Sequence, residues 1–168
     1  MESVLVSACL LGQAVRYNGG DKRSDDGVLQ RWLREGRVVS VCPEVAGGLA
    51  VPRPPAEIAN GAGGLSVLAG DARVFATTAE DVTAAFVQGA EVAAQLAQSH
   101  RIRVAVLKEG SPSCGSSYSY DGTFTGSKVP FPGVTTARLQ QAGIHVFSEH
   151  QFAEADALLQ QLEAQAKA

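Results

Sequence analysis

The chain has few cysteines, no long apolar run and no large basic cluster, and each of these shortages excludes a class of protein. It has three cysteines, one tryptophan and one methionine in 168 residues, and an odd number of cysteines fits poorly with a framework of paired disulfides. No run approaches the roughly 20 apolar residues that a membrane helix needs. The formal charge is −3 and the largest basic group is Lys22-Arg23, which argues against general binding of nucleic acid as a polymer. We therefore expect a cytoplasmic protein without membrane contact, whose reduced thiols serve a metal or catalysis.

Length and composition fit one globular domain over residues 1–168. The chain is 45% hydrophobic and 18% charged, which is ordinary for a soluble domain able to bury a core. The tetrapeptide at residues 6–9 resembles a lipoprotein cleavage box. No Lys or Arg precedes it and the apolar stretch before Cys9 is short, so a secretory signal is not expected. The oligomeric state is left open.

Apolar runs and helical patterns alternate along the chain. Helices are expected after Asp25-Asp26, after a capping box of Thr78 with Asp81, at Val134 to Gln141, and from about residue 151 with fraying after Glu163. Strands are expected at 3–8, 37–41, 102–107 and 144–147, with a hairpin of 65–69 and 73–76. This order predicts a three-layer, Rossmann-like α/β domain with a mainly parallel sheet.

Two long loops, 43–63 and 108–133, interrupt this pattern. Loops of about 20 residues in a compact domain are usually functional. Each holds or directly follows a cysteine, and all three cysteines, Cys9, Cys42 and Cys114, lie where an apolar run ends. The carboxyl ends of parallel strands converge on one crevice, which is where ligands bind. The sequence therefore predicts a metal or iron–sulfur site with one ligand position left open.

Four segments carry a recognisable combination of motifs: residues 6–20 around Cys9, 41–57 around Cys42, 107–115 before and after Cys114, and 120–126. With these motifs the chain resembles the thiouracil desulfidase family, long catalogued as a domain of unknown function, and the resemblance covers nearly the whole chain. It implies a 4Fe–4S cluster held by Cys9, Cys42 and Cys114 with one open iron. It also implies Glu44 and Ser111 as proton-transfer groups. The reaction implied is non-redox removal of sulfur from a small thiolated pyrimidine, such as 2-thiouracil or 4-thiouridine monophosphate.

The residue types suit this chemistry. Thiolates are the usual ligands of iron–sulfur clusters, normally four per cluster, so three leave one iron exposed as a Lewis acid. A soft thiocarbonyl sulfur suits such an iron, and binding would polarise the C=S bond. Glu44 lies two residues past Cys42, about 7 Å along an extended backbone, within reach of a substrate on the cluster.

The candidates for substrate contact come from the loops after Cys9, Cys42 and Ser111. A nucleotide phosphate would need cations or free backbone N–H groups, which favours a thiolated nucleotide over a free base. For several candidates a purely structural role is an alternative to substrate binding. These roles are a turn in the first loop, a turn before Cys114, or an ion pair of Arg53 with Glu57. The candidates are Arg16, Tyr17, Asn18, Gly19, Gly20, Lys22, Arg23, Arg53 and Ser113.

Two rival functions remain open from the residues. Open-site clusters also bind hydroxy acids, so a cluster-dependent hydro-lyase is the alternative enzyme. A zinc-binding structural or sensor module could use the three cysteines with Glu44 as an oxygen ligand. The three histidines show no metal-ligand spacing and are not expected to take part.

Overall fold

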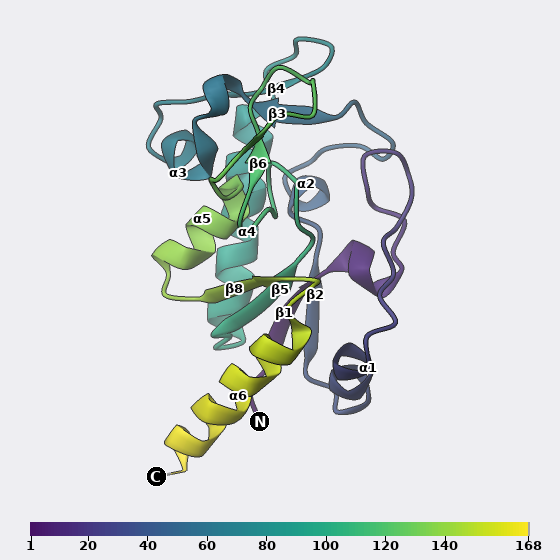
Figure 1. Ribbon diagram of the computed structural model, residues 1–168, viewed down its shortest axis with the longest axis vertical. Coiled ribbons are helices and arrows are strands. Elements are labelled where there is room, and N and C mark those ends of the chain that lie inside the picture. Colours follow the sequence, from purple (N-terminus) through teal and green to yellow (C-terminus); the bar gives the residue numbers. More distant parts are fainter. Residues whose placement is uncertain (168) are drawn as a thin grey trace.

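The computed structural model describes residues 1–167 and is built around one parallel sheet (Figure 1). The strand order is β2-β1-β5-β8, and all neighbouring strands run parallel. The four strands are β1 Val4–Ser7, β2 Val38–Val41, β5 Val104–Leu107 and β8 His145–Ser148. Each falls on one of the four expected apolar runs, so the predicted α/β fold with a parallel sheet is confirmed.

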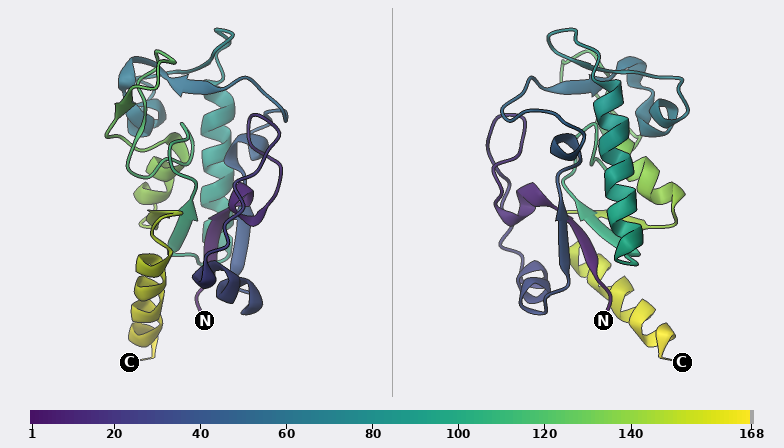
Figure 2. Two further views of the ribbon diagram at one scale, coloured as in Figure 1. Left: turned by 45° about the vertical axis from the view of Figure 1, so that its right-hand side comes forward. Right: turned by 180° about the vertical axis from the view of Figure 1, so that it is seen from behind.

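Helices cover both faces of this sheet. Val4 and Val6 of β1 pack with α1 and α6, whereas Leu5 packs on the opposite face with α4 and α5. This alternation follows from the two-residue period of a strand and gives three layers. Viewed from behind, α4 lies in front of the sheet (Figure 2). The four helices are α1 Gly27–Arg34, α4 Thr83–Ser99, α5 Val134–Gln141 and α6 Phe152–Ala166.

Short elements cover the carboxyl edge of the sheet, at the top of Figure 1. They fold the two long loops into an upper layer, whose own core contains Ile58, Val74 and Phe86. The antiparallel pair β3–β4 and the antiparallel pair β6–β7 belong to this layer. The short elements are η1 Ala8–Leu11, α2 Pro43–Ala46, β3 Ala56–Ile58, η2 Ala59–Gly61, α3 Gly63–Leu68, β4 Val74–Ala76, β6 Ser119–Tyr120 and β7 Lys128–Val129.

One expected strand is a helix. Residues 65–69 were predicted to pair with 73–76, but they belong to α3, and β4 pairs with β3 instead. Gly63, Gly64 and Val67 are buried whereas Leu65 is exposed, a helical spacing of buried positions. A short apolar run does not by itself distinguish a strand from a buried helical turn.

Helix ends differ in detail from the prediction. Asp26 caps α1 as expected, because its carboxylate accepts the Val28 N–H at 2.8 Å. Thr78 and Asp81 do not form a capping box. Asp81 instead accepts both the N–H and the hydroxyl of Thr83, where α4 begins. Helix α6 continues past Glu163 to Ala166, and no helix in residues 1–167 is long and apolar enough to span a bilayer.

Candidate functional site

All three cysteines line one pocket of about 320 Å³ at the carboxyl edge of the sheet. Cys9 lies in η1, directly after β1, and Cys42 follows β2 as the N-terminal cap of α2. Cys114 lies in the loop that follows β5. All three are free thiols, and Cys9 and Cys114 are buried. The structure thus brings together the three residues that the sequence predicts as one set of ligands.

The loop around Cys114 is held by a buried carboxylate. Glu109 accepts the hydroxyls of Ser116 and Ser117 at 2.7 Å each, and also their N–H groups. Ser111 Oγ accepts the N–H groups of Ser113 and Cys114, which closes a tight turn before the thiol. These bonds fix the Cys114 backbone independently of any bound group.

The surroundings of Cys9 and Cys114 oppose the ionisation of these two thiols. Burial and, to a smaller extent, the neighbouring Cys42 raise the pKa of Cys9 to about 11, although Arg16 and Lys108 act in the opposite direction. Burial also raises the pKa of the Cys114 thiol, and the charges of Cys9 and Glu44 add to this effect. Three thiolates in one pocket therefore need a cationic centre to offset their mutual repulsion, which a metal cluster provides.

The grouping of the donors does not favour a single zinc ion. Two thiolates on one Zn²⁺ lie within about 4 Å of each other, because each Zn–S bond is about 2.3 Å. Within residues 1–167, no three Cys, His, Asp or Glu side chains are grouped closely enough to hold a single metal ion. This arrangement does not support the zinc module with Glu44. Three thiols around one pocket fit a larger group, in which each thiolate would bind its own iron.

Glu44 lies between two hydrogen-bond donors at the side of this pocket. Arg53 Nε is 3.2 Å from Oε1, and Ser111 Oγ donates to Oε2 at 3.3 Å. The side chains of Glu44 and Arg53 are only 18% and 7% exposed. The structure therefore joins the two predicted proton-transfer groups, Glu44 and Ser111, in one hydrogen bond.

Arg53 does not form the ion pair with Glu57 that was one of its two predicted roles. Its remaining donors bind the carbonyl oxygens of Val15 and Ala50, so its guanidinium is occupied by the protein. Glu57 instead accepts the N–H groups of Gly122 and Phe124. Arg53 lines the pocket, but its contacts make it a support for Glu44 in this structure.

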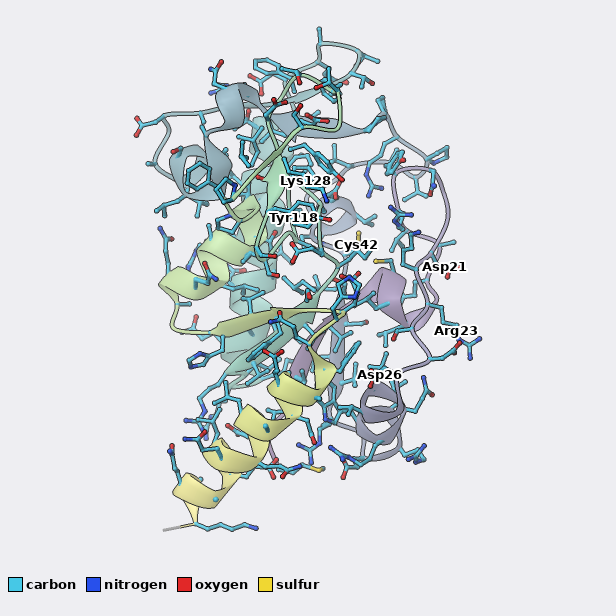
Figure 3. The ribbon with its side chains drawn as sticks, viewed as in Figure 1. Asp21, Arg23, Asp26, Cys42, Tyr118 and Lys128 are labelled. Atoms are coloured by element: carbon cyan, nitrogen blue, oxygen red, sulfur yellow. The ribbon has the colours of Figure 1, made fainter. Side chains whose placement is uncertain are left out.

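The other predicted substrate contacts divide into three groups. Arg16 and Tyr17 line the pocket, with the Arg16 guanidinium 5.7 Å from the centre of the Tyr17 ring. Ser113 is buried beneath Cys114, and its hydroxyl shares a hydrogen bond with Thr135 at 2.8 Å. The rest form an outer turn and do not line the pocket, as Figure 3 shows for Arg23; their role as substrate contacts stays a prediction. These residues are Asn18, Gly19, Gly20, Lys22 and Arg23.

Sequence reasoning missed three prominent pocket residues, Lys108, Tyr118 and Tyr120. Lys108 directly follows β5, and its Nζ is 3.1 Å from a Glu149 carboxylate oxygen. Lys108 follows a strand, as the cysteines do, and this position in the sequence could have identified it as a pocket residue. The sequence Tyr-Ser-Tyr at 118–120 was another such signal, because residues two apart on an extended segment share a face.

Comparisons with known proteins agree with this geometry. The 2-thiouracil desulfurase family matches residues 4–151 of the chain. The chain is 43% identical to the uncharacterized protein YbbK of Bacillus subtilis (strain 168) over 148 residues, which are 88% of this chain and 96% of that protein. It also resembles a solved structure described as the [4Fe-4S]-dependent thiouracil desulfidase TudS. That match has 46% identity and a TM-score of 0.86, and covers 96% of this chain and 99% of the other.

Proposed function

Because the chain belongs to the 2-thiouracil desulfurase family, we propose that it is an iron–sulfur enzyme that removes sulfur from a thiolated pyrimidine. One observation carries the proposal: three free thiols share a pocket with the hydrogen-bonded pair of Glu44 and Ser111. The similar structure is itself described as a [4Fe-4S]-dependent thiouracil desulfidase. These findings favour desulfuration over the hydro-lyase alternative.

Cys9, Cys42 and Cys114 would hold the 4Fe–4S cluster and leave one iron without a protein thiolate. When bound, the cluster supplies a Lewis-acidic iron that suits the soft sulfur of a thiocarbonyl group. The chain's own residues then have to admit water to the thiocarbonyl carbon and move protons. In the overall reaction a C–O bond forms, the C–S bond breaks, and water and the thione become a carbonyl compound and hydrosulfide. No oxidant or reductant is consumed.

Glu44 and Ser111 are placed to move these protons. Arg53 holds Oε1 of Glu44 and leaves Oε2 for Ser111, so the carboxylate has a fixed direction in the pocket. Glu44 accepts a proton from the attacking water, and Ser111 relays a proton between the carboxylate and the substrate ring. General acid–base groups of this kind typically contribute about 10²–10⁴-fold to the rate.

The finer substrate that we propose is a nucleotide such as 4-thiouridine monophosphate. Arg16 supports this choice, because it lines the pocket and its guanidinium contacts only the Tyr17 ring among the interactions that the structure records for it. A guanidinium is well suited to bind phosphate. The pocket, at about 320 Å³, is at the small end of ligand sites, so a base would lie inside with its phosphate at the rim.

The decisive experiment uses anaerobically reconstituted protein and measures sulfide release. Substrates are 2-thiouracil, 4-thiouracil, 4-thiouridine and its monophosphate. We expect turnover, with the highest kcat/KM on the monophosphate, and we expect Arg16→Met to lower that value without affecting the free base. Equal efficiency on base, nucleoside and nucleotide would remove the phosphate site. No sulfide release from any of them would overturn the desulfidase assignment.

A further inference from the structure

Two tyrosines, Tyr118 and Tyr120, line the same pocket as the cysteines. Tyr118 immediately precedes β6 and Tyr120 ends it, so both follow Cys114 closely along the chain. Their rings meet edge to face, with centroids 6.0 Å apart and planes at 85°. This is a favoured arrangement of aromatic pairs. The two rings together form an aromatic wall of the pocket, and because their planes are nearly perpendicular, a flat ring that stacks on one meets the edge of the other.

The Tyr118 ring is fixed in place from two sides. Lys128 of β7 places its ammonium 4.3 Å from the ring centre, and Lys128 is not a lining residue of the pocket. Figure 3 shows Lys128 and Tyr118 near each other, with Cys42, another lining residue of the pocket, lower in the view. The hydroxyl of Tyr118 lies against Gly110, where any Cβ would be 3.0 Å from it. The ring therefore crosses the start of the loop that carries Ser111.

The segment that carries the wall is tied to the rest of the upper layer. Ser119 Oγ donates to the Phe131 carbonyl oxygen at 2.9 Å. Glu57 accepts the N–H groups of Gly122 and Phe124 in the turn between β6 and β7. A Cβ at Gly122 would lie 2.7 Å from the Ile58 carbonyl oxygen, so this turn rests directly on β3. The wall is preorganised, and little ordering cost remains when a ligand binds.

We propose that Tyr118 and Tyr120 are the stacking wall for the pyrimidine ring and set the enzyme's preference for flat heteroaromatic thiones. The inference rests on the proposed function, since it concerns how the substrate of that site is held. Every planar base has a π-face that can stack on an aromatic side chain. Such stacking therefore tolerates chemical differences between bases. The wall faces a pocket that also contains the thiols, so a stacked ring has its plane fixed while its thiocarbonyl group reaches toward them. Aliphatic thioamides carry the same C=S group but have no ring to stack.

The test compares Tyr118→Leu with Tyr118→Phe. Leucine fills part of the space without a π-face, whereas phenylalanine keeps the ring and removes only the hydroxyl. We expect Tyr118→Leu to raise KM for 4-thiouracil by about tenfold or more, the scale of one lost base–aromatic stack, with iron content unchanged. Tyr118→Phe should restore a KM close to that of the parent. Phe124→Leu is the matched control, because Phe124 is an exposed aromatic residue of the same hairpin and does not line the pocket.

Two further measurements separate this proposal from the proposed function. Equilibrium binding of the product uracil reports stacking without any turnover, and Tyr120→Leu tests the second ring if Tyr118→Leu does not fold. Sulfide release by the parent, with KM and uracil affinity unchanged within twofold in both leucine variants, overturns the wall and leaves the reaction intact. Tyrosine-dependent uracil binding without sulfide release from any thiolated pyrimidine overturns the reaction and supports the wall. Parent turnover of thiourea with a kcat/KM equal to that of 4-thiouracil would also overturn the wall.

Discussion

Replacing Gly89 with alanine should damage the site from a distance, through the contact between α2 and α4. A Cβ at Gly89 would lie 2.8 Å from the carbonyl carbon of Pro43, with the carbonyl oxygen nearer still. Ordinary contacts between non-bonded carbon atoms are about 3.5–4.0 Å, so α2 has to move by about 1 Å. The obstacle is backbone, which cannot rotate away as a side chain can.

That movement reaches the chemistry directly. Cys42 caps α2 and Glu44 lies in its first turn, so a displaced α2 carries one proposed ligand and the proposed base with it. A misplacement of about 1 Å can cost about 10²-fold in rate. The free energy of unfolding should change less than the activation barrier does. Overpacking costs about 1–3 kcal/mol, but alanine gains about 1 kcal/mol over glycine within a helix, which offsets part of that cost. We therefore expect Gly89→Ala to fold and to lose about a hundredfold in kcat.

The assay is sulfide release under saturating substrate, with iron per chain and the urea midpoint measured on the same preparation. Gly27→Ala is the matched control. It also lies in a helix, but its Cβ would meet nothing within 4 Å and its backbone is not left-handed. We expect the control to match the parent in kcat and iron content. A Gly89→Ala protein with parental kcat and iron content would show that α2 does not position the site.

Three further outcomes follow. Cys114→Ala should lose both the brown colour of an iron–sulfur cluster and the release of sulfide. Full iron content in this variant would contradict ligation by three thiolates. Glu44→Gln should keep its iron but lose about 10²–10⁴-fold in kcat, because the amide accepts no proton; turnover within a few-fold of the parent would make Glu44 a structural residue. Burial alone would raise the pKa of Glu109, but hydrogen bonds from Ser117 and Ser116 lower it. Ionised Glu109 therefore stabilises the folded protein fully above the unfolded-state pKa of about 4.3. This contribution disappears as the pH falls through the folded-state pKa of Glu109. In urea titrations of apoprotein, Glu109→Gln should be less stable than the parent at neutral pH, and the difference should narrow on acidification; a difference that does not change with pH would refute this role.

The sheet was predictable because each of its strands is a separate apolar run. Strands buried on both faces are continuously hydrophobic, and the runs at β1 and β5 show this without ambiguity. The meeting of the three cysteines followed from topology alone, since parallel strands place their carboxyl ends at one edge. Local sequence sufficed to bring the three cysteines together, because each directly follows a strand or lies in the loop after one.

The upper layer was not predictable by the same reasoning. Helix α3 was mistaken for a strand because its run is too short to show a period. The partner of Arg53 was not predictable either. The sequence left open an ion pair with Glu57, four residues away, or a contact with substrate, but in the structure Arg53 binds Glu44, on α2. That choice depends on how the loop after α2 folds back on the Val15 carbonyl oxygen, a contact across 38 positions in the chain.

The two kinds of residue in this site therefore have different origins in the fold. Cys9 and Cys42 lie just past the ends of sheet strands and Cys114 lies in the loop that follows β5, and these strands are fixed by the two cores on either side. The tyrosines lie on a hairpin whose position depends on Glu57 of β3, a residue with no role in the sheet. Under the proposed function, substitutions in the hairpin can therefore alter which ring is accepted while the three thiols stay in place. This separation predicts that relatives with the same three cysteines can differ in substrate through the segment between β6 and β7.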